Sequence, residues 1–355
     1  MNRIYFDNAA TTSLDPEVLE TMMPFLTTHF GNPSSIYSYG RETRLAIENA
    51  RKSVAKILNA HPAEIFFTSG GTESSNTAIF SSVSDLGCKH IITSCIEHHA
   101  TLHTVEYLAH AGEAKLSYVK LLSNGHIDQE DLERLLAESK EKCLVTLMHA
   151  NNEIGNILDI HAVGELCKRY NAIFHSDTVQ TVGHFPFDLR NTPVHFITGA
   201  GHKFHGPKGV GGLYVRKGFG LTPLLHGGEQ MGGLRAGTVD VASMVGMGWA
   251  MKLATSTMAI AYEKNHVSKL RDKLEAAILE LPETIVIGGR ENRTPNTTLI
   301  SIRGVEGESM LWDLNQNGVG ASTGSACASE DLEANPVMNA FGSDSELAHT
   351  GVRFS

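Results

Sequence analysis

Short apolar runs alternate with amphipathic helical patterns along most of the chain. Between residues 41 and 58, apolar side chains recur at helical spacing, as on the buried stripe of a helix: Ile47, Ala50, Val54, Ile57 and Leu58. Short apolar runs typical of buried strands occur at residues 65–68, 90–93, 143–148, 172–175 and 210–215. Strands that alternate with helices predict the α/β class, with a mostly parallel sheet covered by helices on both faces.

A change in helical character suggests where the chain divides. Residues 240–281 have a helical pattern almost throughout, rich in Met and Ala at first and charged from Glu263 onward. Two strand-like runs follow, at 284–287 and 298–302. We therefore expect a large domain over 15–255 and a smaller α+β domain made of 1–14 and 256–355, with the N-terminal residues completing it.

Composition narrows the functional classes. With 355 residues, 41% of them hydrophobic, the chain can bury a large core. A formal net charge of −10 argues against nucleic acid or an anionic membrane surface as a direct ligand. No run approaches the roughly 18 apolar residues of a spanning helix, and the first ten residues do not resemble a secretion signal. We expect a soluble, cytoplasmic protein.

The five cysteines differ in their surroundings. They form no Cys-x-x-Cys pair, so neither a zinc site nor a disulfide framework is indicated, and a reducing compartment fits best. Cys88, Cys95, Cys143 and Cys167 flank or lie within apolar segments and are expected to be structural. Cys327 instead lies among small and polar residues at 321–329, which predicts an exposed loop and a thiol able to act as a nucleophile.

Lys203 and Asp177 together indicate pyridoxal 5′-phosphate (PLP). Lys203 lies in Gly-His-Lys-Phe-His-Gly-Pro-Lys-Gly (201–209), and Asp177 lies in His-Ser-Asp-Thr-Val-Gln (175–180). A lysine amine can form a Schiff base with the PLP aldehyde, and a fixed carboxylate keeps the ring nitrogen protonated. A solvated surface lysine is the ordinary alternative.

Two further motifs follow predicted strands, where ligands bind in doubly wound sheets. Ser-Gly-Gly-Thr-Glu (69–73) follows strand 65–68 and begins a helix, so Gly71 and Thr72 are expected to form a phosphate cup. His98, in Ile-Glu-His-His (96–99), follows strand 90–93 and can relay protons near neutral pH. An ordinary turn and a surface histidine are the alternatives.

These motifs resemble a known family. Gly-His-Lys with Gly-Pro-Lys-Gly, together with Gly-Ser-Ala-Cys-Ala-Ser (324–329), resembles the NifS/IscS-like cysteine desulfurases, which are fold-type I PLP enzymes of the class-V aminotransferase family. The resemblance extends from residues 5–12 to 352–355. It implies a PLP-transferase fold, with a mostly parallel seven-stranded sheet in the large domain and a smaller α+β domain.

The resemblance also implies roles for particular residues. Lys203 and Cys327 would be catalytic, with His98 stacked on the cofactor ring and assisting proton transfer. Substrate L-cysteine would bind through Arg353 and Asn152, with Asn32 near Arg353 or simply forming a turn. The remaining cofactor contacts would come from Gly71, Thr72, Asn152, Asp177, Gln180, His202 and Thr238, with Thr238 reaching the partner's phosphate in a homodimer with composite sites.

Three departures from the family pattern affect these expectations. Ala200 replaces a serine that contributes a phosphate hydroxyl in relatives, a loss of roughly 1 kcal/mol. Ala236 replaces another serine, beside the retained Thr238. The chain stops at Ser355, before the tail by which relatives complete the small domain and recruit scaffold proteins, so the small domain is expected to be truncated.

The implied reaction converts L-cysteine to L-alanine and leaves a persulfide on Cys327, which supplies sulfur to an acceptor or to an iron–sulfur scaffold protein. Three alternatives remain open from the sequence. One is another PLP enzyme of this fold, a carbon–sulfur lyase or an aminotransferase, which would not need Cys327. The second is a catalytically impaired docking protein. The third, a metal site, is weak because no set of side chains has ligand spacing.

Overall fold

A computed structural model describes residues 3–323, 336–340 and 349–355. Its central feature is a seven-stranded sheet, in which only β8 runs antiparallel to its neighbours. The α/β class and the mostly parallel sheet are therefore confirmed. In spatial order the strands are β2 (Ile65–Thr68), β8 (Gly211–Val215), β7 (Phe196–Ala200), β6 (Ile173–Asp177), β5 (Cys143–Thr146), β3 (His90–Thr93) and β4 (Lys115–Tyr118).

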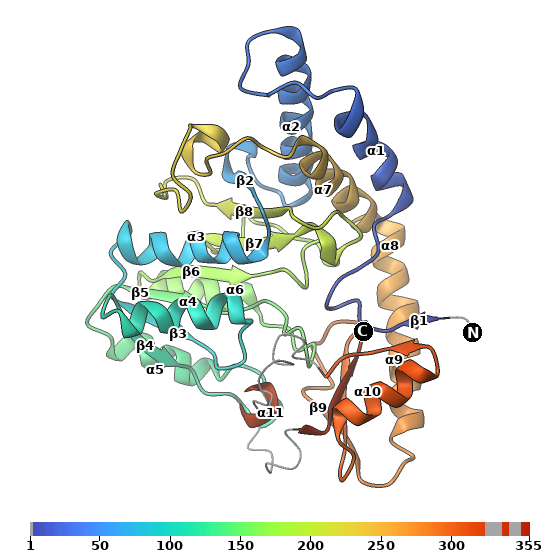
Figure 1. The fold of residues 1–355 in the computed structure, drawn as a ribbon. Coiled ribbons are helices and arrows are strands. Elements are labelled where there is room, and N and C mark those ends of the chain that lie inside the picture. Colours follow the sequence, from blue (N-terminus) through green and yellow to red (C-terminus); the bar gives the residue numbers. More distant parts are fainter. Residues whose placement is uncertain (1–2, 324–335, 341–348) are drawn as a thin grey trace.

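Helices cover both faces of this sheet (Figure 1). On one face, α3 (Gly71–Ser84) and α4 (His99–His110) bury Ile79 and Val105 against the strands. On the other face Val163 and Met247 belong to a larger core, which is covered by α2 (Ser38–Ile57), α5 (Gln129–Glu138), α6 (Ile160–Arg169) and α7 (Val241–Ala254). Helix α1 (Pro16–Thr27) packs on α7.

The apolar runs located five of the seven strands, each within a few residues. The two that they did not indicate are β4 and β7. Strand β4 lies at the sheet edge and is only partly buried, so its sequence Lys-Leu-Ser-Tyr has no apolar run. Strand β7 is fully buried, but it contains Thr198 and Gly199, which interrupt the apolar pattern.

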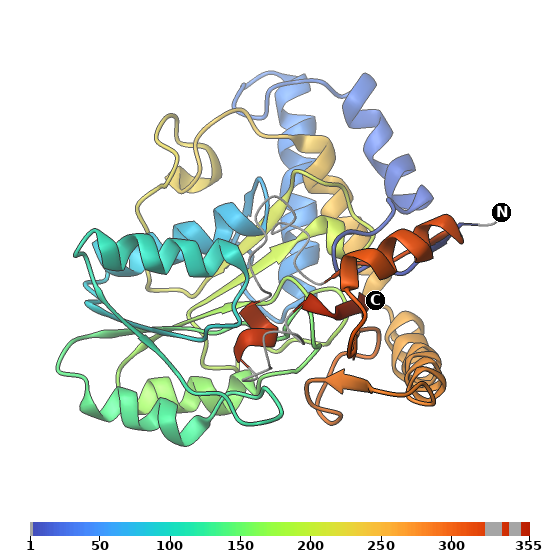
Figure 2. The ribbon, with the colours of Figure 1, turned by 60° about the horizontal axis from the view of Figure 1, so that its bottom comes forward.

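Two smaller sheets lie beside the large one. An antiparallel sheet in the order β12-β10-β9 contains β9 (Thr284–Ile287), β10 (Thr298–Ile302) and β12 (Gly351–Phe354). The N-terminal strand β1 (Ile4–Tyr5) does not join it, and pairs in parallel with β11 (Val319–Gly320) instead. Helix α10 (Gly307–Gln316) precedes β11, and α11 (Pro336–Ala340) lies beside β12, where Met338 packs near Gly351 (Figure 2).

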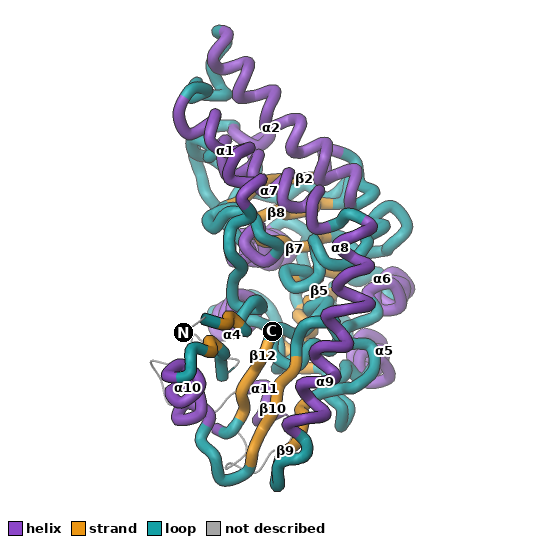
Figure 3. Tube along the Cα trace, turned by 90° about the vertical axis from the view of Figure 1, so that its right-hand side faces the viewer, coloured by secondary structure: helices purple, strands orange, loops and turns teal. Residues whose placement is uncertain are grey.

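A long helical rod connects the large sheet to the small one (Figure 3). It contains α8 (Thr257–Tyr262), a π-helical turn η4 (Glu263–Val267) and α9 (Ser268–Ile278). The helix expected over 240–281 is thus interrupted after α7, where the Ser256 side chain caps α8. Short 3₁₀ turns are η1 (Pro62–Glu64), η2 (Gly201–Lys203) and η3 (Gln230–Gly233). None of the helices in the described ranges is both long and apolar enough to span a membrane.

Candidate active site

A cavity of about 340 Å³ opens where β5, β6 and β7 end. It brings together nearly all of the residues that the sequence motifs singled out. Those lining it are Gly71, Thr72, His98, Asn152, Asp177, Gln180, Ala200, His202, Lys203 and Arg353. The carboxyl edge of the sheet therefore gathers segments that are far apart in the sequence, as expected for a ligand site in an α/β fold.

Lys203 lies in the 3₁₀ turn directly after β7, and its amine faces the N-terminal segment. Its Nζ donates to the backbone oxygens of Ala9 at 2.5 Å and Ala10 at 2.9 Å. The neighbouring His202 binds the same segment, with Nδ1 3.1 Å from Thr11 Oγ1. Burial and the charges of Lys203 and Lys208 lower the pKa of His202 to about 4, so this imidazole is neutral at physiological pH.

Asp177 ends β6 at the floor of the cavity and is 7% exposed. Its Oδ1 accepts a 2.9 Å hydrogen bond from the Val179 N–H. Burial raises the pKa of this carboxyl, whereas the charges of His98 and Lys203 and the Val179 hydrogen bond oppose the rise. A cationic group placed beside Asp177 would favour its ionised form.

His98 is the N-cap of α4, and its Nδ1 accepts a hydrogen bond from the Ala100 N–H at 3.1 Å. That bond leaves Nε2 as the protonated nitrogen of the neutral ring. Burial lowers the pKa of His98, although Asp177 opposes this effect. Of the two adjacent histidines, His98 is the one whose side chain caps α4. The Nδ1 of His99 lies 3.2 Å from His103 Nε2 instead.

The start of α3 forms one end of the cavity. Gly71 and Thr72 occupy its first turn, where backbone N–H groups have no acceptor within the helix. A side chain at position 71 would meet Val179 Cγ2 at 2.9 Å, so only glycine fits between the two elements. Ala200 is adjacent and contributes no hydroxyl group. The helix start and the small residues leave room for an anion such as a phosphate.

Arg353 lies on β12 and is 2% exposed. Its Nη2 donates to Asp7 Oδ1 at 2.6 Å, and its Nη1 donates to the Asn152 backbone oxygen at 3.0 Å. The Gln180 side chain also binds the N-terminal segment, donating to Ala9 O at 2.9 Å. Residues 7–10 therefore contact the charged groups on both sides of the cavity.

Two predicted site residues of the described ranges do not line this cavity within one chain. Thr238 is exposed on the loop before α7. Asn32 is exposed in the α1–α2 connection, where its Oδ1 accepts from the Ser34 N–H at 2.9 Å, as in an ordinary turn. The turn that the sequence left open as the alternative for Asn32 fits this contact. Cys327 lies outside the described residues.

The other four cysteines are unsuited to nucleophilic attack. Cys88, Cys143 and Cys167 are buried, and Cys95 is partly buried, as their apolar surroundings predicted. Burial raises the pKa of all four thiols, and for Cys88 the value rises to about 12. None of these thiols forms a disulfide in the part of the chain that is described.

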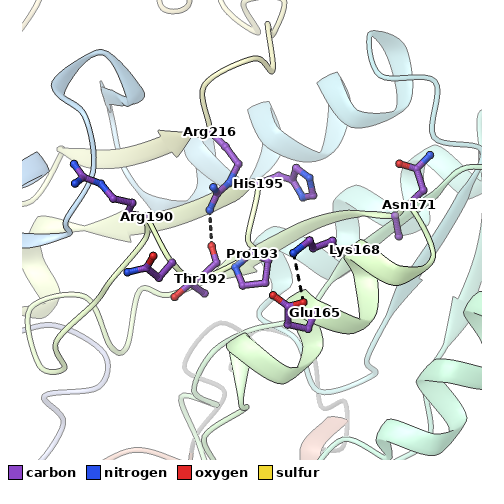
Figure 4. Close-up of a pocket in the computed structure, with 10 residues that line it drawn as sticks. Glu165, Lys168, Asn171, Arg190, Thr192, Pro193, His195 and Arg216 are labelled. Carbon is purple, nitrogen blue, oxygen red and sulfur yellow. Dashed lines mark hydrogen bonds and ion pairs between the residues drawn. The ribbon is translucent and has the colours of Figure 1, made fainter.

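A second cavity, of about 320 Å³, is lined by several charged side chains (Figure 4). Its Arg216 already donates to the backbone oxygens of Leu189, Thr192 and Val194. Lys168 is paired with Glu165 at 3.6 Å. Because these charged groups are engaged with the protein itself, the cavity around Lys203 is the better candidate for chemistry.

Sequence reasoning missed several residues of the site. Asp7, Ala9 and Ala10 contact Arg353 and Lys203, although Tyr-Phe-Asp-Asn-Ala-Ala-Thr-Thr (5–12) was recognised only as a family motif. Glu97, the residue before His98, lines the cavity as well. A carboxylate that directly follows Ile96 in the short connection after a predicted buried strand is the available signal for Glu97.

Comparison with known proteins agrees with this geometry. The sequence profile of the family described as "Aminotransferase class-V" matches residues 4–355. The chain is 46% identical over 355 residues to the cysteine desulfurase IscS of Dictyoglomus turgidum (strain DSM 6724 / Z-1310), covering 99% of this chain and 89% of the relative. It is 44% identical over 358 residues to the cysteine desulfurase NifS of Azotobacter vinelandii, covering 100% of this chain and 88% of the relative.

Solved structures are similar over the same length. A structure titled "NIFS-LIKE PROTEIN" superposes with a TM-score of 0.92 at 39% identity, covering 99% of this chain and 93% of that one. A structure titled "SspA in complex with cysteine" superposes with a TM-score of 0.87 at 31% identity, covering 99% of this chain and 98% of that one.

Proposed function

Because the chain belongs to the aminotransferase class-V family, we propose that it is a PLP-dependent cysteine desulfurase, which converts L-cysteine to L-alanine and transfers the sulfur to Cys327. The observation that carries the proposal is the meeting of Lys203, Asp177 and His98 around one cavity with Arg353. Relatives named cysteine desulfurase cover almost the whole chain and support this reaction over others of the family.

The residues around the cavity fit PLP. Lys203 offers the amine for covalent attachment, and the buried Asp177 offers a carboxylate to the ring nitrogen. His98 would stack on the ring, and the N-terminus of α3 with Thr72 would hold the phosphate. When bound, PLP supplies an electron sink for the bonds at Cα of the substrate. Asn152, Gln180 and His202 complete the proposed contacts within the protomer.

L-Cysteine fits the same cavity. The Arg353 guanidinium would bind its carboxylate, since a planar fork of N–H donors suits that group. Lys203 would take the Cα proton, with His98 assisting the transfer. The similar structure titled with bound cysteine supports this substrate.

Sulfur transfer requires a thiol other than the buried ones. In the proposed step the Cβ–S bond of L-cysteine breaks and an S–S bond forms at Cys327, giving a persulfide. The electron pair of the broken bond stays with carbon, which takes up a proton to become the methyl group of alanine, while the Cys327 sulfur is oxidised. The persulfide would then supply an acceptor or an iron–sulfur scaffold protein, a partner class that the names IscS and NifS of the relatives support.

We also propose a homodimer with composite sites. Large apolar side chains are exposed along α1, α2 and their connection, including Phe30 at 75% and Ile36 at 89%. Several large apolar side chains exposed on neighbouring segments are typical of an interface. Thr238 is exposed and lies outside the cavity of its own chain, so it is available to a partner's phosphate site. The family resemblance assigns Thr238 that role.

The proposed division into domains, 15–255 against 1–14 with 256–355, is supported by the separate sheets and by the break between α7 and α8. The proposed cytoplasmic location rests on the cysteine pattern, in which buried thiols without a disulfide suit a reducing compartment.

The decisive experiment is incubation with L-cysteine, with alanine and sulfide measured together and the peptides analysed by mass spectrometry after one turnover. We expect alanine, and the mass of one extra sulfur atom on the Cys327 peptide. Cys327→Ser should bind PLP but form neither alanine nor a persulfide on that peptide. Cys95→Ser should form both. Pyruvate with unchanged sulfide from Cys327→Ser would favour a carbon–sulfur lyase. Bound PLP without any product would favour a docking protein.

A further inference from the structure

Glu97 is a buried carboxyl group to which the proposed reaction assigns no part. It precedes His98 in the β3–α4 connection and is 6% exposed. Its Oε1 accepts two hydrogen bonds, from Ser94 Oγ at 2.8 Å and from the Met148 N–H at 3.0 Å. Its Oε2 has no hydrogen-bond partner among the described residues, although it is equally buried. A buried ionised oxygen without any partner is strongly unfavourable.

Two other carboxylates that are as buried as Glu97 have a cation beside them, as does the partly buried Glu73. Glu275 lies 2.5 Å from Arg293, Asp131 lies 2.7 Å from Arg134, and Glu73 lies 3.0 Å from Arg235. Within the described ranges, Glu97 has no ion pair with lysine or arginine. The cation beside each of these three carboxylates offsets the free-energy cost of burying a negative charge. Among the described residues, Glu97 has no such ion pair to offset that cost.

A second carboxyl group of the same cavity is Asp177. Both side chains line the cavity, and the negative charge of Asp177 acts on Glu97. Burial raises the pKa of Glu97 to about 8, with the Asp177 charge adding to the rise and the bonds from Met148 and Ser94 opposing it. Two neighbouring carboxyl groups in a medium of low polarity favour a state in which one of them keeps a proton.

The charged groups around Glu97 and Asp177 indicate which of these two carboxyl groups keeps the proton. Burial raises the pKa of Asp177 as well, but the charge of Lys203, and that of His98 when its ring is protonated, oppose this rise and favour the ionised form of Asp177. Around Glu97, the other titratable or charged groups are His126 in an adjoining cavity of about 30 Å³, the sequence neighbours Cys95 and His98, and, lining the main cavity, His99, Glu153, His202, Lys203 and Arg353. Neither Lys203 nor Arg353 forms an ion pair with Glu97 among the described contacts.

We propose that Glu97 is a positioning residue that retains its proton at working pH. Its Oε1 fixes the connection that carries His98 to the end of β5, and its neutral state leaves Asp177 as the ionised carboxyl of the pair. The inference rests on the proposed function, because it is the bound PLP ring that requires a charged Asp177. Glutamine, the shape of a protonated glutamate, should therefore replace Glu97 without loss.

The first test measures thermal stability of the PLP-bound enzyme against pH. If the folded state keeps the Glu97 proton while the unfolded chain releases it near its ordinary pKa of 4.5, wild-type stability falls as pH rises toward about 8. Glutamine has no proton to release in this range, so the stability of Glu97→Gln does not fall for this reason. The midpoint of Glu97→Gln relative to wild type should therefore increase steadily between about pH 5 and pH 8.

Glu275→Gln is the matched control, because Glu275 is as buried as Glu97 and is paired with Arg293. Burial raises the pKa of Glu275, but the Arg293 and Thr298 contacts outweigh it and the net pKa is lowered. Its glutamine variant should be less stable than wild type by a constant amount over the same pH range. A similarly flat difference for Glu97→Gln would overturn the proposal, since it would mean that Glu97 is already ionised.

The second test measures PLP affinity by equilibrium titration of the apoenzyme. Glu97→Ala removes the acceptor for Met148 and Ser94, and should weaken PLP binding by about tenfold, whereas Glu97→Gln should match wild type. An equal loss in both variants would overturn the neutral state, and no loss in Glu97→Ala would overturn the positioning role. If Glu97→Ala fails to fold, the pH series with glutamine still decides. Neither test uses turnover, so failure here and failure of the desulfurase reaction are distinguishable.

Discussion

The Arg353 guanidinium donates a 2.6 Å hydrogen bond to the carboxylate of Asp7, a residue 346 positions earlier in the chain. The same guanidinium donates to the backbone oxygen of Asn152, at the end of the large sheet. One buried side chain thus joins the N-terminal segment, the small sheet and the wall of the active-site cavity. Its orientation is fixed by partners that do not include the substrate.

This arrangement predicts a selective effect of Arg353→Lys on substrate binding. A lysine presents a point charge and cannot contact Asp7, Asn152 and a substrate carboxylate with a planar fork. We expect KM for L-cysteine to rise by about tenfold, equivalent to about 1.4 kcal/mol, with a smaller change in kcat. Steady-state kinetics test this. Arg290→Lys, at an exposed position, is the control, and an unchanged KM in Arg353→Lys would remove Arg353 from the substrate site.

Lys203 is predicted to be the single point of covalent attachment for PLP. Its amine lies in the cavity beside the Ala9 and Ala10 backbone oxygens, whereas Lys208 in the same motif is exposed. Borohydride reduction followed by peptide mass spectrometry should find PLP on the Lys203 peptide of the wild type and of Lys208→Ala. Lys203→Ala should carry none. Cofactor attached to Lys208 would contradict the assignment.

His184 predicts a pH-dependent contribution to stability. Its Nδ1 lies 2.9 Å from Glu263 in the π-helical turn, and its Nε2 lies 3.0 Å from the Lys203 backbone oxygen. Burial lowers the pKa of His184, but the bond to Glu263 and its charge outweigh burial, so the net pKa is raised. The stabilisation is therefore complete below the ordinary value of 6.5 and is lost as pH rises through the raised pKa.

His184→Gln should accordingly be less stable than wild type by about 1 kcal/mol in mildly acidic solution, with the difference shrinking toward alkaline pH. Thermal unfolding over a pH series measures it. Glu263→Gln should show the same trend, and the double variant should lose little more than either single one, because both changes remove one interaction. Additive losses would show that the two residues act separately.

The exposed apolar surface at the α1–α2 connection predicts dimerisation through this region. Ile36→Asp places a charge at its most exposed apolar position and should shift the protein toward monomer in sedimentation analysis. PLP binding should weaken in parallel if Thr238 completes the partner's site. Met258→Asp, equally exposed on α8 away from this connection, should leave the oligomeric state unchanged. A dimer that persists in Ile36→Asp would place the interface elsewhere.

Local chemistry explains why much of this site was predictable. A motif such as Gly-Gly-Thr after an apolar run determines its own turn and helix start, because those preferences depend on neighbours in sequence. The rule that ligands bind at the carboxyl ends of parallel strands then brought Thr72, His98, Asp177 and Lys203 to one edge. The α/β class followed from the same alternation of strands and helices.

Features that depend on distant partners were not predictable in this way. Strand β4 is polar because it lies at an edge, and β1 pairs with β11 instead of joining the small sheet. The contacts of Asp7 with Arg353 and of Ala9 with Lys203 join residues separated by most of the chain. No spacing in the sequence encodes such contacts.

The sequence by itself therefore determined the chemical groups: an amine at Lys203, a carboxylate at Asp177 and a thiol at Cys327 in polar surroundings. Only the tertiary structure decided the electrostatic state of Asp177, because burial and neighbouring charges are properties of the assembled cavity. Glu97 illustrates the difference. In the sequence it is one of 39 acidic residues, whereas in the described part of the fold it is a buried carboxyl group that shares a cavity with Asp177 and has no ion pair with lysine or arginine.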